Sequence, residues 1–215
     1  MNIKVLLADD HRILREGLVV LLDKEPGITV VGEAEDGRAT VQLARKLFPD
    51  VVIMDVSMPE LNGIEATRQI VTEVPGVKVI ALSMHSNKHF IKGMLMAGAS
   101  GYLLKHSASR ELVKAIKIAM TNQIYLSPEI AGVVVEDYRS PAPDTSAFAK
   151  LTPREQEVLQ LIAEGKVPRE ISASLNLSLK TVEAYRRQIM DKLGCKSYAD
   201  LVKYAIREGL TSLDY

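Results

Sequence analysis

Short apolar runs alternate with longer segments of helical periodicity through the first 125 residues. The runs are bounded by Gly, Pro or charged residues and predict strands that are buried on both faces. They occupy residues 3–8, 28–34, 51–55, 77–82 and 101–104. Between and after them, apolar residues recur every three or four positions, which predicts five helices. We therefore expect an α/β fold, a doubly wound five-stranded parallel sheet with right-handed crossovers.

Residues 147–215 show helical periodicity only. Thr152-Pro153-Arg154-Glu155 is a capping box with proline at the first helical position, which predicts a helix start. Two further helices meet at Asn176-Leu177, and a fourth follows Ser197. This arrangement predicts a second, smaller all-α domain that contains a helix-turn-helix.

The segment 126–146 separates these two parts. Ser127-Pro128 and the run from Ser140 to Ser146 are rich in residues that interrupt periodic structure. The apolar run Ile130–Val135 between them predicts a short helix, and it can pack on either domain. We assign a first domain to 1–125, a linker to 126–146 and a second domain to 147–215.

Acidic residues follow two of the predicted strands. Asp55 ends the run Val51–Asp55, and Asp9-Asp10 follow the first strand. Asp55 alone is equally well explained as a turn former. If the strands are parallel neighbours, however, three carboxylates meet where α/β sheets bind ligands. Two carboxylates about 4 Å apart repel by roughly 4 kcal/mol at an effective dielectric of about 20, so the cluster predicts a hard divalent cation, Mg²⁺.

Two more strands end in groups that suit phosphoryl chemistry. Ser83 ends the fourth strand and Lys105 follows the fifth. Each by itself is more often a solvated strand end. Together, a hydroxyl and an ammonium at this edge can hold the oxygens of a phosphoryl group carried by Asp55.

One face of the helix after Ser178 combines long cations with small or amide side chains. Such a face can enter a major groove, although charge alone favours a solvated helix face. Glu183 on the same helix would repel phosphates unless it is paired with Arg186 or Arg187. The candidate DNA-contacting residues are Lys180, Thr181, Ala184, Arg187 and Gln188, with Arg186 and Lys192 flanking them.

Composition adds few constraints. Lys and Arg together number 27, as do Asp and Glu, so net charge does not point to nucleic acid. Cys195 is the single cysteine and cannot form an internal disulfide, which fits a reducing cytoplasm. No apolar run has the length of a targeting or membrane-spanning segment, and we expect no membrane contact.

Residues 3–120 resemble the receiver domain of two-component response regulators. The matching motifs are Asp9-Asp10, Met54-Asp55-Val56-Ser57-Met58-Pro59, Asn62-Gly63, Ser83, Gly101-Tyr102 and Lys105. The resemblance implies that a sensor histidine kinase phosphorylates Asp55. It further implies that Mg²⁺ is held by Asp10, Asp55 and the Ser57 backbone carbonyl, supported by Asp9. Ser83 and Tyr102 would form the switch pair.

Residues 150–208 are similar to the DNA-binding domain of NarL/FixJ or LuxR-type regulators. The similarity rests on Leu151–Leu159, Leu177–Glu183 and Ile189–Gly194. Val167-Pro168 and Tyr185 depart from the family pattern and leave base preference open. The resemblance implies binding to double-stranded promoter DNA and homodimer formation on phosphorylation.

We therefore predict a transcription regulator rather than an enzyme. The competing enzyme is a Mg²⁺-dependent phosphatase of the haloacid dehalogenase type. That class needs a second aspartate two residues after the nucleophile, where this chain has Ser57. A third hypothesis is a receiver-controlled module whose C-terminal helices bind protein.

Overall fold

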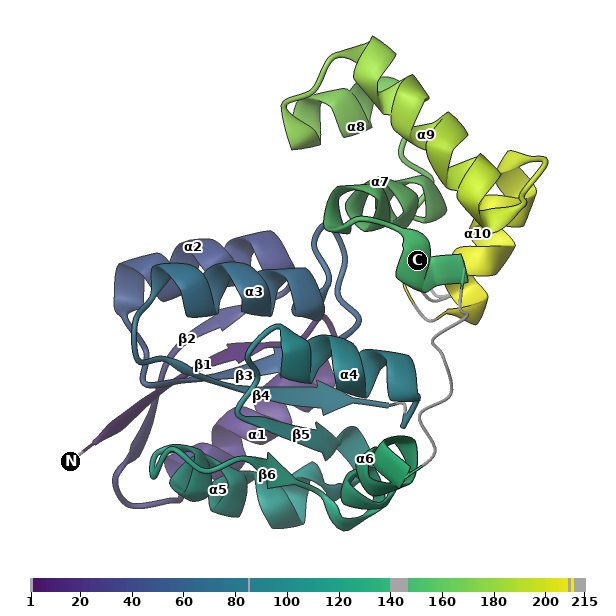
Figure 1. Cartoon of the computed structure of the whole chain (residues 1–215). Helices are drawn as coiled ribbons and strands as arrows, with labels where there is room; N and C mark the ends of the chain where they lie inside the picture. The colour runs from purple at the N-terminus through teal and green to yellow at the C-terminus, as the bar shows by residue number, and fades with distance from the viewer. Residues whose placement is uncertain (1, 85, 140–146, 209, 211–215) are drawn as a thin grey trace. The chain divides into compact units, whose positions relative to one another are not determined.

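The predicted strands form one parallel sheet in the computed structural model, which describes residues 2–84, 86–139, 147–208 and 210. The strands lie in the order β2-β1-β3-β4-β5-β6, and every neighbouring pair is parallel (Figure 1). Their bounds are β1 Ile3–Ala8, β2 Ile28–Ala34, β3 Val51–Asp55, β4 Lys78–Ser83, β5 Gly101–Leu104 and β6 Tyr125–Leu126. The parallel α/β sheet that we predicted is confirmed.

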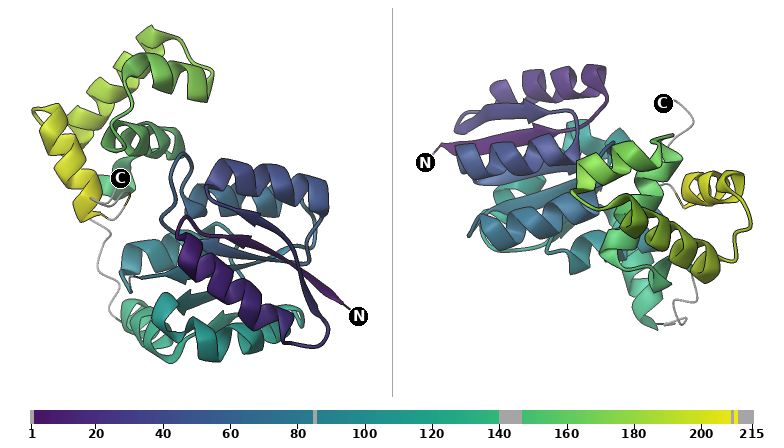
Figure 2. Two further views of the ribbon diagram at one scale, coloured as in Figure 1. Left: turned by 180° about the vertical axis from the view of Figure 1, so that it is seen from behind. Right: turned by 90° about the horizontal axis from the view of Figure 1, so that it is seen from above.

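Helices cover both faces of this sheet. Residues such as Val52 pack with α2, α3 and α4, whereas Ile53 and its counterparts pack with α1 and α5. The left view of Figure 2 shows α1 on the face opposite to α3. Burial on both faces explains why these strands are continuously apolar in sequence. The bounds are α1 Arg12–Asp23, α2 Gly37–Leu47, α3 Gly63–Glu73, α4 Lys88–Met96, η1 Lys105–Ser107 and α5 Ala108–Ala119.

The sheet contains one strand that we did not predict, and the short helix predicted at Ile130–Val135 is longer than expected. β6 adds a sixth strand, in which Tyr125 pairs with Gly101 and Leu126 with Tyr102. The segment that we assigned to the linker then forms helix α6, Pro128–Arg139. Contacts divide the chain into the units Met1–Pro141 and Ala142–Tyr215, so α6 belongs to the first unit. The rest of the predicted linker, 140–146, lies outside the described residues.

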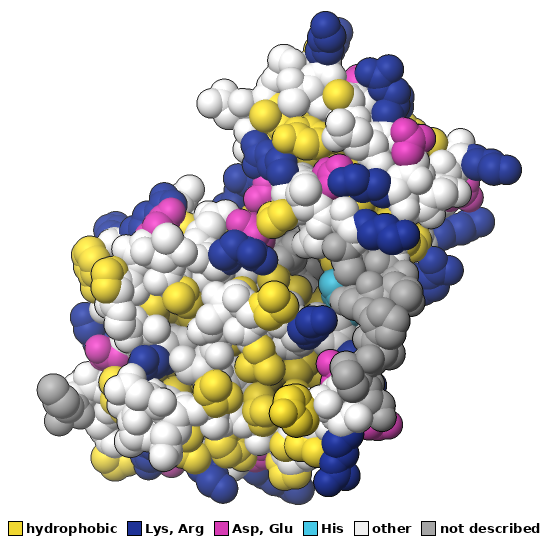
Figure 3. Space-filling view, viewed as in Figure 1, with side chains coloured by type: hydrophobic (Ala, Val, Ile, Leu, Met, Phe, Trp, Pro, Cys, Tyr) yellow, Lys and Arg dark blue, Asp and Glu magenta, His cyan; other side chains and the backbone are white. Residues whose placement is uncertain are grey.

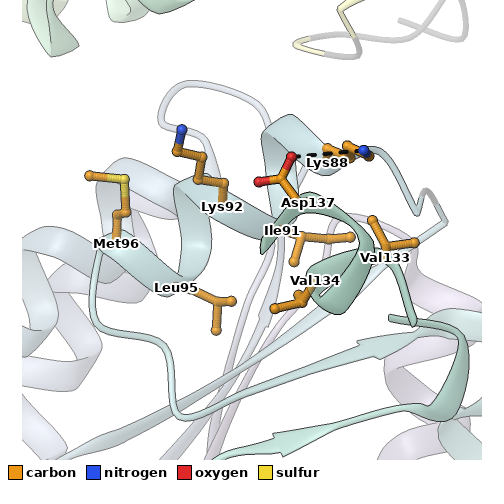
Figure 4. A pocket seen from close by; sticks show the side chains of 8 residues that line it. All are labelled: Lys88, Ile91, Lys92, Leu95, Met96, Val133, Val134 and Asp137. Carbon is orange, nitrogen blue, oxygen red and sulfur yellow. Dashed lines mark ion pairs between the residues drawn. The ribbon is translucent and has the colours of Figure 1, made fainter. Parts of the chain in front are cut away.

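Helix α6 packs against α4. Ile130 is fully buried in the core shared with that helix. In Figure 4 Ile91 and Leu95 of α4 face Val134 of α6 across a shallow groove, and Lys88 pairs with Asp137 at 3.7 Å. The apolar run after Pro128 therefore packs on the first unit, one of the two possibilities that the sequence left open.

The second unit contains only helices. A core residue comes from each α-helix, for example Val158, Ile171, Val182 and Leu201. The predicted capping box at Thr152 is present, and the turn between α8 and α9 passes through Asn176 in the left-handed conformation. The bounds are η2 Ala147–Lys150, α7 Pro153–Ala163, α8 Pro168–Leu175, α9 Leu179–Leu193 and α10 Tyr198–Arg207.

We expect Gly63→Ala to destabilise the first unit. A Cβ at Gly63 would lie 2.1 Å from the main-chain oxygen of Asp55, because α3 starts directly against the end of β3. Such overpacking costs about 1–3 kcal/mol. Gly17→Ala is the control, since a Cβ there meets nothing within 4 Å in α1, and it should stabilise by roughly 0.5–1 kcal/mol. Urea unfolding followed by circular dichroism measures both; equal stabilities would contradict this packing.

Candidate functional site

Three acidic residues meet at one edge of the sheet. β1 ends just before Asp9, and Asp55 is the last residue of β3. Because these strands are parallel neighbours, their ends lie together. Ligand atoms of Asp9, Asp10, His11 and Asp55 all lie within 4.8 Å of one another. The structure thus brings together the three aspartates that the sequence analysis selected.

Lys105 lies at the centre of this cluster. It opens η1 directly after β5, and its Nζ is 2.7 Å from Asp55 Oδ2 and 2.8 Å from Asp9 Oδ2. The Ser57 backbone N–H donates to Asp55 Oδ1 at 3.2 Å. The carboxylate of Asp55 therefore has a positive or polar partner at each oxygen, while its side chain is only 3% exposed.

Burial dominates the electrostatics of the site. It raises the pKa of Asp55 to about 7; repulsion from Asp9 adds to the rise, and attraction to Lys105 opposes it. For Lys105, burial disfavours the charged form, but attraction to Asp55 and Asp9 outweighs it, so its pKa is raised. Together, the ionised carboxylates would carry more negative charge than the single positive charge of Lys105 can balance. An additional cation would stabilise the ionised form of Asp55.

The predicted switch residues Ser83 and Tyr102 are in contact. Ser83 ends β4, and Tyr102 lies on β5 with its side chain fully buried. A side-chain hydrogen bond joins the two hydroxyl groups. Burial raises the pKa of Tyr102 to about 12, and the charge of Asp55 contributes to the rise. Tyr102 is therefore a neutral phenol at neutral pH.

His11 was not selected by the sequence analysis. Its Nδ1 is 2.7 Å from Asp10 Oδ1 and its backbone N–H donates to Asp9 Oδ1 at 2.9 Å. The position directly after Asp9-Asp10 is the available signal. A histidine after a strand end is commonplace, however, so only the fold reveals that it faces the carboxylates.

The predicted DNA-contacting face lies on α9. Val182 and Ile189 point into the core of the second unit, and the helix begins after Ser178, whose side chain caps it. Within the described residues, Lys180 and Arg187 are exposed and form no ion pair. In the space-filling view, Lys and Arg side chains gather over the helices of this unit (Figure 3). The residues grouped on this face are Lys180, Thr181, Ala184, Arg187 and Gln188.

The two flanking cations have partners inside the unit. Arg186 pairs with Glu183 at 2.6 Å and lies 5.1 Å from the ring centre of Tyr198. Lys192 Nζ is 2.6 Å from Glu155, the acidic member of the capping box of α7. The Glu183 charge that weakened the DNA hypothesis is therefore paired, while Arg186 and Lys192 are engaged in holding helices together.

Comparison with known proteins identifies both units. The family model "Response regulator receiver domain" matches residues 5–117, and that of "Bacterial regulatory proteins, luxR family" matches residues 149–205. The response regulator UvrY of Escherichia coli strain K12 is 40% identical over 212 residues, 99% of this chain and 97% of UvrY. This chain belongs to the LuxR-family response regulators. As a response regulator with a DNA-binding domain of this type, it regulates transcription.

Solved structures agree with this assignment. The RcsB response regulator of Salmonella typhimurium has a TM-score of 0.68 and 32% identity, covering 98% of each chain. A complex of RcsB with DNA has a TM-score of 0.61 and 30% identity, covering 98% of this response regulator and all of that chain. None of the helices among the described residues combines the length and apolar composition that crossing a membrane requires.

We expect Lys192→Met to lower the unfolding free energy of this response regulator more at pH 7 than below pH 4. Burial opposes ionisation of Glu155, but hydrogen bonds from Lys192 and Thr152 outweigh it and lower its pKa. A lowered folded pKa gives stability that is present above the unfolded value of 4.5 and is lost as pH falls through the folded value. Urea unfolding at both pH values tests this, with exposed Lys203→Met as control. A pH-independent difference would contradict the pairing.

Proposed function

We propose that Asp55 is the phosphoacceptor of this response regulator and that a sensor histidine kinase is its phosphoryl donor. An oxygen of the Asp55 carboxylate attacks phosphorus. The new O–P bond forms as the bond between phosphorus and the donor histidine breaks, and the electron pair leaves with that nitrogen. Lys105, which contacts Asp55 Oδ2 at 2.7 Å, is placed to pair with the oxygens of the incoming group. The convergence of Asp9, Asp10, Asp55 and Lys105 at one strand edge carries this proposal.

The same pocket suits Mg²⁺. Asp9 Oδ2 and Asp55 Oδ2 share the ammonium of Lys105, at 2.8 and 2.7 Å, so one positive charge serves both carboxylates. Clustered carboxylate oxygens are the donors that hard divalent ions prefer. Asp9, Asp10, Asp55 and the Ser57 carbonyl would hold the ion. When bound, Mg²⁺ would neutralise the carboxylates and draw charge from the phosphoryl oxygens.

Ser83 and Tyr102 would rearrange when Asp55 is phosphorylated. A phosphoryl group on Asp55 brings about two negative charges to the ends of β3 and β4. The Ser83 hydroxyl can donate to it, which exchanges its present hydrogen bond with Tyr102. A change at Tyr102 reaches α6 through a direct contact, because the Ser127 N–H donates to the Tyr102 main-chain oxygen at 3.1 Å. This would couple phosphorylation to β5 and α6, and through α6 to α4, against which α6 packs.

The α9 face would bind promoter DNA. Its exposed Lys180 and Arg187 suit phosphates, and Gln188 and Thr181 suit base edges. RcsB binds DNA, and in one structure two RcsB dimers lie on two parallel DNAs. We infer that this protein likewise binds two half-sites as a homodimer when it is phosphorylated. A single half-buried cysteine suits the cytoplasm as its location.

Selection of bound sites from a random DNA pool tests the function. The full chain is incubated with Mg²⁺, with and without acetyl phosphate as phosphoryl donor. We expect one sequence, repeated as two half-sites, to be enriched more strongly with the donor. Equal recovery of all sequences in both arms would reject DNA binding in favour of a protein-interaction module. Release of inorganic phosphate from small phosphate esters would instead favour a phosphatase.

A further inference from the structure

A buried guanidinium lies directly behind the acidic pocket. Arg15 of α1 is only 6% exposed. Its Nη1 donates to the main-chain oxygen of Asp9 at 2.5 Å, its Nε to Glu33 at 3.1 Å and its Nη2 to Glu35 at 3.0 Å. Burying a charge is costly unless it is paired and hydrogen-bonded. The planar guanidinium of arginine presents several N–H donors in a fixed arrangement, which the compact ammonium of lysine does not.

The contact with Asp9 acts on the peptide that joins the two acidic residues. The Asp9 carbonyl and the Asp10 N–H belong to one rigid plane. On its other side Asp9 is held through its N–H, which donates to the Ala34 oxygen of β2 at 3.2 Å. Fixing this plane sets the directions in which the side chains of Asp9 and Asp10 leave the backbone. It therefore sets where their carboxylates lie relative to Asp55.

We propose that Arg15 is a positioning residue for the cation site. It acts through the Asp9 backbone, and Glu33 and Glu35 anchor its guanidinium from β2 and the residue after it. The inference rests on the proposed Mg²⁺ site and goes beyond it, because it assigns the geometry of that site to a residue outside the acidic cluster. Loss of Arg15 should loosen the Asp9-Asp10 peptide and weaken cation binding even where the protein remains folded.

A purely structural role is the competing explanation, since Arg15 also ties α1 to β2. Arg45, which is more exposed than Arg15, provides a comparison for the loss of an arginine that pairs two elements. It forms two hydrogen bonds with Glu73, joining α2 to α3, and neither residue belongs to the acidic cluster. Removing either arginine costs an ion pair between elements. Only removal of Arg15 should change Mg²⁺ affinity.

The test is calorimetric titration of the full chain with MgCl₂, together with urea unfolding in the absence of Mg²⁺. The variants are Arg15→Met, Arg15→Lys and Arg45→Met. We expect both Arg15 variants to bind Mg²⁺ about 10-fold more weakly than wild type, the scale of an outer-shell ligand partner. Arg45→Met should bind as wild type does. Lysine retains the charge but lacks the planar fork, so its failure to restore affinity identifies a geometric effect.

Unchanged affinity in Arg15→Met, or full restoration by Arg15→Lys, would overturn the inference. If wild type and Arg45→Met bind no Mg²⁺, the proposed cation site itself is wrong, and the inference falls with it. Should the Arg15 variants fail to fold, the double variant Glu33→Gln/Glu35→Gln keeps Arg15 but removes its charged anchors. It should bind Mg²⁺ more weakly, by up to about 10-fold, and wild-type affinity in this variant would equally overturn the inference.

Discussion

Asp55→Asn should take up no phosphate from acetyl phosphate in the presence of Mg²⁺. Asparagine has nearly the same shape as aspartate, so the buried position at the end of β3 remains filled. Its amide nitrogen and carbonyl oxygen cannot act as the anionic nucleophile that phosphoryl transfer needs. Uptake is measured as the mass gain of one phosphoryl group in the intact protein, and it should fall to background.

The matched control for this experiment is Asp23→Asn. Asp23 is an exposed carboxylate at the end of α1, outside the acidic cluster. Its loss changes net charge by the same amount and should leave phosphate uptake unchanged. Persistent labelling of Asp55→Asn, at a rate similar to wild type, would show that another residue is the phosphoacceptor.

Arg187→Ala should weaken binding to selected DNA and reduce its dependence on salt. Arg187 is exposed on α9 and forms no ion pair among the described residues, so its charge is available to a phosphate. Each phosphate contact contributes about 0.9 to the slope of the logarithm of affinity against the logarithm of salt concentration. Removing one contact should therefore reduce the magnitude of this slope by roughly 1.

Fluorescence anisotropy with labelled DNA at several salt concentrations measures the affinity and slope. Lys203→Ala is the control, because Lys203 is an exposed cation on α10 and not on the proposed α9 face. It should leave the slope near the wild-type value. An Arg187→Ala protein with wild-type affinity at every salt concentration would exclude α9 as the docking face.

The acidic pocket could be predicted from sequence because parallel strands impose a common edge. A buried apolar run that ends in Asp9-Asp10 and another that ends in Asp55 leave few ways to place the carboxylates once the strands are neighbours. The same reasoning placed Lys105 at this edge, because β5 ends just before it. The regular geometry of a parallel sheet thus allows local sequence patterns to predict a site formed by residues far apart in the chain.

The sequence pattern did not predict which charged side chains form ion pairs with one another. Lys192 and Arg187 both appeared as surface cations of one helix, yet Lys192 pairs with Glu155 of α7, whereas Arg187 forms no ion pair among the described residues. Arg15 was not singled out from the sequence, but the fold buries it against Asp9, Glu33 and Glu35. Long flexible side chains reach partners that periodicity does not specify.

The sequence by itself determined the two fold classes and placed Asp9-Asp10 and Asp55 at the ends of buried strands, because backbone hydrogen bonding and burial impose strict periods. That β1 and β3 are neighbours in the sheet came from the tertiary structure. The tertiary structure alone decided that residues 125–139 extend the first unit as β6 and α6, and which cation of α9 pairs with an acidic residue of α7. Short or polar segments carry too little periodic signal, and their conformation depends on the surfaces that neighbouring elements present to them.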